Sequence, residues 1–183
     1  MNPLSDYAKL PIGAHAPALV NAVIEIPLGS VNKYEYDKQL KVFRLDRTLY
    51  SPVHYPGDYG FIPSTEASDG DPLDLLVLVD APSFPGCVME VRPIGLLRMV
   101  DQGQRDSKVL AVTSSDPKYQ EVKDYSGVYP HILREIEHFF AIYKKLEGKS
   151  TETIGWEDVA SARQVIENCR ARYQRSSAAD KRG

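Results

Sequence analysis

The spacing of apolar residues changes once along this chain of 183 residues, near Ile132. Between Val20 and Pro93, apolar residues alternate with polar ones or form short runs that end at turn residues, which is typical of antiparallel strands. After Ile132 they recur every three or four residues, as on one face of a helix. Strands first and helices last predict an α+β fold built around a closed or nearly closed β-barrel.

The predicted elements are six strands and two helices. The strands read "VIEIP", "KYEYD", "LKVFRL", "LDLLVLV", "CVMEVRPIGLLRMV" and "KVLAV". The apolar face of the first helix covers 132–146, and that of the second covers 159–173. The small polar residues of 174–183 predict a flexible tail. No linker interrupts the sequence, so we expect one domain over 1–183.

Composition narrows the class of protein. The net charge of −3 shows no basic excess, which argues against a general nucleic-acid binder. No run approaches the roughly 18 apolar residues of a membrane span, and the first residues, "MNPLSDYAKLPIG", lack the basic and apolar segments of a leader. Cys87 and Cys169 form no CxxC pair and are expected to be free thiols. We therefore expect a cytoplasmic protein without nucleic-acid or membrane partners.

The stretch "DGDPLDLL" over 69–76 places three aspartates within six residues at the start of a predicted strand. Carboxylates this close repel one another unless cations or hydrogen bonds offset the repulsion. Mg²⁺ prefers such oxygen ligands and takes only one or two carboxylates, so three aspartates suit more than one ion. A solvated turn is the alternative interpretation.

Acidic, basic and tyrosine residues are interleaved elsewhere in the sequence. Further acids on or beside predicted strands are Glu25, Glu35, Asp101 and Asp106. The bases near them are Lys33, Arg47 and Lys108. A polyphosphate that arrives with Mg²⁺ needs both kinds of group, and phenols such as Tyr55, Tyr59 and Tyr143 can donate to phosphate without adding charge. Taken singly, each of these residues is more often part of a solvated surface, a turn or the core than of a site.

Together these stretches resemble the soluble family I inorganic pyrophosphatases, which are Mg²⁺-dependent enzymes that hydrolyse pyrophosphate to two phosphates. "DGDPLDLL" fits the family signature of Asp, a small residue, Asp, Pro, an apolar residue and Asp. Blocks such as "LDRTLYS", "YPGDYGFIP" and "HFFAIYKKLEGK" follow in family order, and the match covers about 19–173. The resemblance implies a five-stranded OB-like barrel with flanking strands, two helices packed outside it, and a homo-oligomer, with a hexamer favoured.

The resemblance also implies the role of each site residue. Asp71 matches the residue that takes the proton from the attacking water. The metal ligands implied are Asp69, Asp74, Asp101, Asp106 and Glu25, with Glu35 near the cluster. The pyrophosphate-binding residues implied are Lys33, Arg47, Tyr59 and Tyr143, supported by Tyr55, Lys108 and Lys144. Several Mg²⁺ ions per site are expected, with Mn²⁺ as an alternative. Gln102 departs from the acid that many bacterial relatives carry there, which predicts weaker binding of an outer ion.

Three other functions fit parts of the pattern. An OB-like barrel can bind single-stranded nucleic acid, but the carboxylates would repel a phosphate backbone. A calcium-binding EF-hand loop that began at Asp69 would place Leu73 at a ligand position and Asp74 where glycine is needed. A phosphatase with an Asp-x-Asp nucleophile needs that motif after an apolar strand, whereas Asp69 follows the polar "STEASDG". Pyrophosphate hydrolysis fits more of the sequence than any of these.

Overall fold

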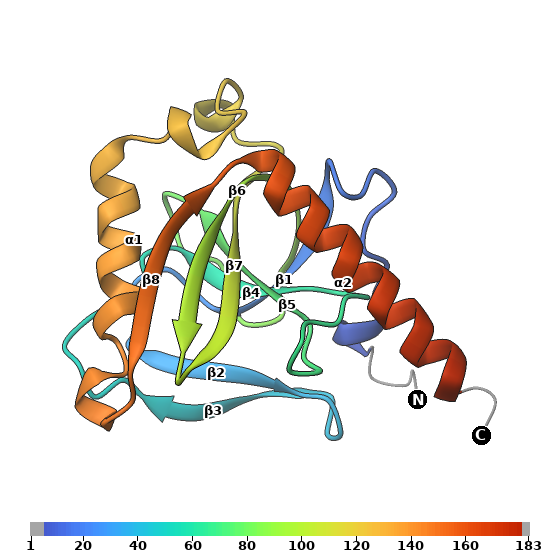
Figure 1. Cartoon of the computed structure of the whole chain (residues 1–183), viewed down its shortest axis with the longest axis horizontal. Helices are drawn as coiled ribbons and strands as arrows, with labels where there is room; N and C mark the ends of the chain where they lie inside the picture. Colours follow the sequence, from blue (N-terminus) through green and yellow to red (C-terminus); the bar gives the residue numbers. More distant parts are fainter. Residues whose placement is uncertain (1–5, 181–183) are drawn as a thin grey trace.

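Five strands close into a barrel in a computed structural model of the chain, which describes residues 6–180 (Figure 1). Around the barrel they are β1 (Val20–Ile26), β4 (Asp58–Ile62), β5 (Leu73–Leu78), β7 (Gln104–Thr113) and β6 (Val88–Asp101). β1 pairs with β6 and so closes the ring. β5 and β7 run parallel, and the other neighbours are antiparallel. The predicted five-stranded barrel is confirmed.

Three further strands flank the barrel. β2 (Asn32–Asp37) and β3 (Val42–Thr48) form a separate two-stranded ribbon, which lies along one end of the barrel in Figure 1. β8 (Thr151–Glu157) extends the sheet beyond β6. β4 and β8 were not among the predicted strands. β4 is buried at all five positions and therefore shows no alternation, whereas β8 is a largely polar edge strand.

Two helices cover different sides of the barrel (Figure 1). α1 (Pro130–Ile142) ends four residues before the predicted end of the first helix. α2 (Val159–Asp180) continues beyond the predicted end of the second helix. Residues 174–180 of the predicted flexible tail continue α2 as a helix, and 181–183 lie outside the described residues. None of the described helices is long and apolar enough to cross a membrane. The short 3₁₀ helices are η1 (Tyr7–Lys9), η2 (Pro117–Tyr119), η3 (Tyr125–Gly127) and η4 (Lys145–Glu147).

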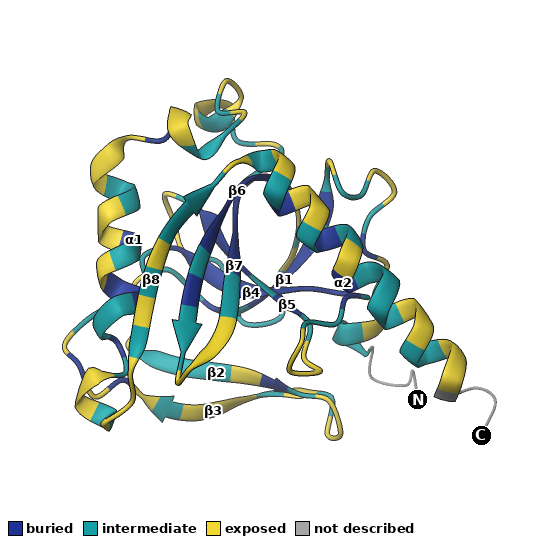
Figure 2. Ribbon diagram, viewed as in Figure 1, coloured by how far each residue is buried: buried dark blue, intermediate teal, exposed yellow. Residues whose placement is uncertain are grey.

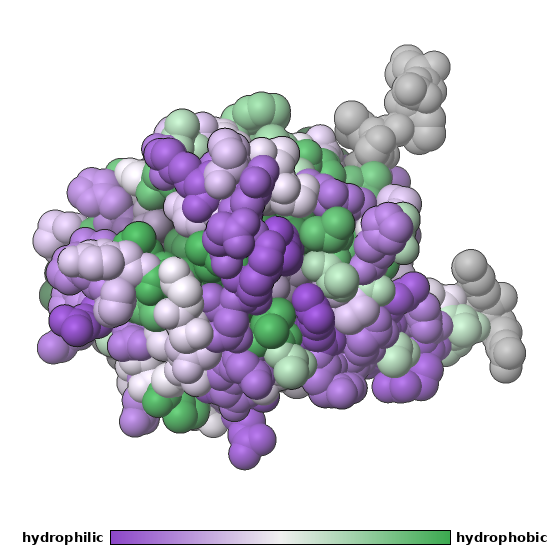
Figure 3. Space-filling model, turned by 90° about the horizontal axis from the view of Figure 1, so that it is seen from above, coloured by the Kyte–Doolittle hydropathy of each residue, from purple (hydrophilic) through white to green (hydrophobic). Residues whose placement is uncertain are grey.

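Alternate residues of β5 supply two apolar clusters. Leu75 and Val77 belong to the cluster that α2 covers, whereas Leu76 and Leu78 belong to the cluster that α1 covers. Figure 2 shows β5 buried and most of the β2–β3 ribbon more exposed. The face seen from above carries its hydrophobic residues in small patches among hydrophilic ones (Figure 3). The barrel is therefore a rigid apolar support for the polar groups at its end.

Candidate active site

The β2–β3 ribbon and the barrel enclose a cavity of about 260 Å³, which we call the ribbon cavity. Six of the predicted site residues line it: Glu25, Lys33, Glu35, Tyr59, Asp71 and Asp74. Its remaining lining residues are Tyr36, Lys38, Phe61 and Pro72. Lys38, which sequence reasoning missed, donates from Nζ to Asp71 Oδ1 at 2.6 Å. The ribbon thus brings bases from β2 and from its tip to acids at the end of the barrel.

Tyr59 reaches the cavity from β4, which must pass close to β1. A Cβ atom on Gly60 would lie 1.9 Å from the carbonyl oxygen of Val23, so only glycine fits there. The hydroxyl of Tyr59 donates to Asp74 Oδ2 at 2.6 Å. Burial and the adjacent Asp74 charge raise the pKa of Tyr59 well above its usual value. Tyr59 therefore stays protonated at neutral pH and can act as a donor.

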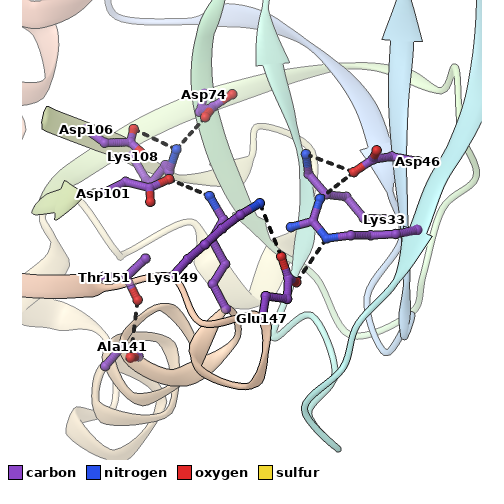
Figure 4. Close-up of polar contacts among 12 residues, drawn as sticks. Lys33, Asp46, Asp74, Asp101, Asp106, Lys108, Ala141, Glu147, Lys149 and Thr151 are labelled. Atoms are coloured by element: carbon purple, nitrogen blue, oxygen red, sulfur yellow. Dashed lines mark hydrogen bonds and ion pairs between the residues drawn. The ribbon is translucent and has the colours of Figure 1, made fainter. Parts of the chain in front are cut away.

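Lys108 lies between two of the predicted metal ligands (Figure 4). Its Nζ contacts Asp74 Oδ2 and lies 2.7 Å from Asp106 Oδ1. Burial lowers the pKa of Lys108, but the two carboxylates outweigh burial and raise it overall. Burial also raises the pKa of Asp106, with Asp74 and Asp101 adding to the effect and Lys108 opposing it. The site therefore holds a buried cation and several carboxylates at close quarters.

Asp101 is paired through one oxygen only. Oδ2 accepts a hydrogen bond from Lys144, whereas Oδ1 is buried and has no partner among the described residues. Tyr143, the C-cap of α1, lies near these carboxylates. Burial raises the pKa of Tyr143, and Asp101, Asp106 and Asp74 raise it further. A buried carboxylate oxygen without a partner favours a cation ligand at this place.

Three of the predicted ligands, Asp69, Asp74 and Asp106, line a second cavity of about 210 Å³. α2 forms one wall of it, so we call it the helix cavity. Pro72 and Asp74 line both cavities and so separate them. Asp69 does not line the ribbon cavity, and its Oδ1 accepts a hydrogen bond from the Asp71 amide at 3.0 Å. The predicted proton acceptor and the predicted ligand Asp69 thus lie in different cavities.

Glu25 has the most perturbed carboxyl in the ribbon cavity. Its pKa is raised to about 8, chiefly by burial and further by Asp74 and Glu35, although the Tyr36 amide and Lys33 oppose the shift. The Tyr36 amide donates to Oε1 at 2.7 Å. Glu25 is therefore mostly protonated at neutral pH unless a further cation lies beside it.

A β-bulge places two adjacent side chains of β3 near each other. Lys33 pairs with Arg47 and Tyr34 pairs with Leu45, which leaves Asp46 as the extra residue of β3. Asp46 contacts Arg47, and its Oδ2 lies 3.6 Å from Lys33 Nζ. Lys33 also contacts Glu35, as their two-residue spacing predicts.

Arg47 has a second acidic partner that is distant in the sequence. Its Nε donates to Glu147 Oε1 at 2.9 Å, across 100 residues. Burial lowers the pKa of Arg47, but the hydrogen bonds to Glu147 and Asp46 outweigh burial and raise it. Sequence reasoning gave no role to Asp46 or Glu147, although Asp46 directly precedes Arg47 in "LDRTLYS" and Glu147 lies within "HFFAIYKKLEGK". Nothing in either block indicates that Glu147 contacts Arg47.

Six of the predicted site residues, together with Gln102, line neither cavity: Arg47, Tyr55, Asp101, Lys108, Tyr143 and Lys144. Tyr55 is almost fully buried, with its ring 5.5 Å from that of Tyr59 and 4.8 Å from that of Phe139, so it supports the site from the core. Gln102 is exposed in the turn between β6 and β7 with a φ of 49°, and its amide donates to the Ser150 carbonyl at 2.9 Å. Its side chain therefore contributes little to either cavity wall.

The acidic side chains fit Mg²⁺ by their chemistry. Within residues 6–180, no three His, Cys, Asp or Glu side chains converge closely enough to hold one ion unaided. Mg²⁺ needs only one or two carboxylates, however, and keeps several waters. The donors here are all carboxylates, and Asp101 Oδ1 is buried and unpaired within the described residues. Oxygen donors suit Mg²⁺ or Mn²⁺, whereas metals that prefer thiolate ligands do not fit this set of donors.

Comparisons with known proteins agree with one another. A family model described as inorganic pyrophosphatase matches residues 22–174. An inorganic pyrophosphatase of Synechocystis is 52% identical over 169 residues, which are 92% of this chain and 99% of that protein. One from Halalkalibacterium halodurans is 51% identical over 158 residues, or 86% and 97% of the two chains. The crystal structure of the inorganic pyrophosphatase from Thermus thermophilus aligns with a TM-score of 0.91 at 47% identity, covering 93% of this chain and 99% of that chain.

Proposed function

The chain belongs to the inorganic pyrophosphatase family and hydrolyses inorganic pyrophosphate to two orthophosphates, and on that premise we propose that the reaction takes place in the ribbon and helix cavities with Mg²⁺. The observation that carries this assignment is the position of Asp74. Asp74 lines both cavities, and one of its oxygens contacts both Tyr59 and Lys108. A carboxylate there can be shared by two metal ions, one on each side, which is the role that the resemblance implies for Asp74.

The proposed metal site uses the carboxylates that lie around Asp74. The ligands are Asp69, Asp74, Asp101, Asp106 and Glu25, with Glu35 close to them. When bound, Mg²⁺ supplies Lewis acidity, which lowers the pKa of a coordinated water and offsets charge on phosphoryl oxygens. Lys108 contacts Asp74 and Asp106, and Lys144 contacts Asp101, so the two lysines offset part of the carboxylate charge. Mn²⁺ takes the same oxygen ligands and is the expected substitute.

Asp71 is the proposed general base. It lines the ribbon cavity from the loop before β5, and Lys38 contacts its Oδ1. Its carboxylate is largely exposed, so water can reach it directly. Asp71 takes the proton from the attacking water while the phosphoryl group is displaced in line.

Cationic and phenolic donors bind the pyrophosphate in this proposal. They are Lys33, Arg47, Tyr59 and Tyr143, with Tyr55, Lys108 and Lys144 in support. Burial keeps the tyrosines protonated, so they donate to phosphate oxygens without adding charge. Lys33 and Arg47 lie within a network of ion pairs and can stabilise charge that develops on the phosphoryl oxygens.

Phosphate release tests this function. The purified protein is incubated with pyrophosphate in Mg²⁺, in a chelator, and in a chelator followed by excess Mg²⁺, with ATP as the comparison substrate. We expect release from pyrophosphate only when Mg²⁺ is available, and far slower release from ATP. Equal release in the chelator would rule out the metal-dependent mechanism, and no release in any condition would rule out the activity.

The proposal extends to assembly and setting. We expect one domain that assembles into a homo-oligomer, with a hexamer favoured, and acts in the cytoplasm without nucleic-acid or membrane partners. Light scattering after size-exclusion chromatography should give six times the 20.5 kDa of one chain. The mass of a single chain would contradict the assembly without affecting the assignment of the site.

A further inference from the structure

Glu147 is a buried carboxylate that the mechanism above does not use. It ends η4, the 3₁₀ turn that follows α1, and Gly148 closes this turn with a φ of 72°. Only 6% of its side chain is exposed. A carboxylate that is buried to this extent is costly unless cations and hydrogen bonds surround it. The groups that contact the Glu147 carboxylate therefore indicate its role.

Two cations surround Glu147 (Figure 4). Arg47 Nε donates to Oε1 at 2.9 Å, and Lys149 Nζ lies 3.5 Å from Oε2. The turn itself is held by its own backbone, because the Glu147 amide donates to the Lys144 carbonyl at 3.0 Å. The turn thus does not need the Glu147 side chain for its hydrogen bonds. The side chain serves the contact with Arg47 instead.

The guanidinium of Arg47 is held on two of its three nitrogens. Nε is bound to Glu147 and Nη1 to Asp46. Nη2 is buried and has no partner among the described residues. A buried donor without a partner is costly, and on the binding role proposed for Arg47 this nitrogen is the one left for a ligand that accepts from it.

The ion pairs near Arg47 hold its guanidinium from two sides. Three cations, Lys33, Arg47 and Lys149, contact three carboxylates, Glu35, Asp46 and Glu147. Of these carboxylates, Asp46 and Glu147 contact the guanidinium itself. Because the guanidinium is planar and rigid, holding two nitrogens fixes the direction of the third.

We propose that Glu147 is a positioning residue that orients Arg47 so that Nη2 donates to the pyrophosphate, an inference that rests on the binding role proposed above for Arg47. The side chain of Asp46 is 34% exposed, whereas that of Glu147 is 6% exposed and therefore more tightly enclosed. Glu147 is therefore the partner that fixes the plane of the Arg47 guanidinium. A misplacement of about 1 Å at such a group can cost about 100-fold in rate.

A double-mutant cycle tests this role. The wild type, Glu147→Gln, Arg47→Ala and the double variant are compared by the Kd of imidodiphosphate, measured by calorimetry without added metal, and by KM and kcat for pyrophosphate with Mg²⁺. We expect Glu147→Gln to weaken analogue binding and lower kcat/KM by about 10-fold or more, and to change neither when Arg47 is already alanine. Glu147→Asp, which keeps the charge, should lose less than Glu147→Gln. Glu135→Gln is the matched control, because Glu135 is 60% exposed on α1.

The cycle separates the two proposals. An equal loss from Glu147→Gln in both backgrounds would show a structural role only and overturn the inference, as would no loss in the wild-type background. If Arg47→Ala leaves analogue binding and kcat/KM unchanged, the substrate-binding role of Arg47 fails and this inference fails with it. Thermal unfolding of all variants shows whether each is folded. Should Glu147→Gln not fold, the same cycle with Glu147→Asp decides, and additivity in it overturns the inference.

Discussion

The aspartates of the proposed site fall into two groups that differ in how the protein holds them. Asp74, Asp101 and Asp106 belong to strands of the barrel, and each contacts a lysine that is largely buried. Asp69 and Asp71 lie in the loop before β5. Asp71 has a side chain that is 70% exposed, and its lysine partner is itself exposed. The same residue type is thus fixed in one place and free to adjust in the other.

This difference separates two demands of the proposed reaction. Metal ligands need a defined geometry, which the partly buried strand positions supply for Asp74, Asp101 and Asp106. Asp69 is the one proposed ligand in the loop, where its Oδ1 accepts a hydrogen bond from the Asp71 amide. A proton acceptor needs access to water and room to accept and release a proton, which the loop supplies. Each strand aspartate forms an ion pair with Lys108 or Lys144. Breaking either group should therefore produce a different loss.

Asp74→Asn should have the largest effect, because this strand aspartate lines both cavities. The amide keeps the shape but removes the charge that Tyr59 and Lys108 contact. We expect kcat to fall by about 1,000-fold or more in steady-state phosphate release with Mg²⁺. A loss of less than about tenfold would show that Asp74 is not a shared ligand.

Asp71→Asn breaks the loop group instead. Loss of a general base typically costs about 100-fold to 10,000-fold in kcat, and we expect a loss in that range at pH 7. Because the side chain is exposed, thermal unfolding should stay unchanged. Turnover close to that of the wild type would remove Asp71 as the base.

Lys108→Met and Lys38→Met compare the ion pairs of the strand aspartates with the ion pair of the loop aspartate. Lys108→Met leaves Asp74 and Asp106 as partly buried charges without a cation, so the free energy of unfolding in a chelator should fall by about 3 kcal/mol. Lys38→Met is the matched control in the loop, where an exposed pair is worth about 0 to 1 kcal/mol. Denaturant unfolding measures both. Equal losses in the two variants would erase the distinction between strand and loop aspartates.

Glu25→Gln should have the smallest effect on stability, and that effect should appear in the dependence of stability on pH when no metal is bound. The pKa of Glu25 is raised from 4.5 to about 8 in the folded chain, chiefly by burial. Ionisation is therefore costly only in the folded state, so this group lowers stability progressively as pH rises from about 4.5 to about 8. Denaturant unfolding in a chelator should show a flatter profile for Glu25→Gln over that window. The same slope of unfolding free energy against pH in the wild type and in Glu25→Gln would contradict the raised pKa of Glu25.

Local pairs in the site were predictable from the sequence. Lys33 and Glu35, like Asp106 and Lys108, are two residues apart, and a strand places such pairs on one face. The barrel followed from the alternating runs, although β4 was missed because it is buried on both faces. These features depend on spacing along one element, which a sequence displays directly.

Long-range partners were not predictable from the same patterns. Glu147 contacts Arg47 across 100 residues. The side-chain contact between the neighbours Asp46 and Arg47 depends on a bulge, and therefore on the register of β2 and β3. Lys38 reaches Asp71 across 33 residues from the tip of the ribbon. Such contacts follow from how the ribbon and the turn after α1 pack against the barrel, and no local period encodes them.

Mg²⁺ binding to the Asp71→Asn and Asp74→Asn variants is the most direct test of the division between the two groups. Isothermal titration calorimetry is done in one buffer on the wild type and both variants, each with its turnover measured from the same preparation. The account predicts that Asp71→Asn binds Mg²⁺ like the wild type but turns over slowly, whereas Asp74→Asn loses both. Unchanged Mg²⁺ binding by Asp74→Asn would contradict it.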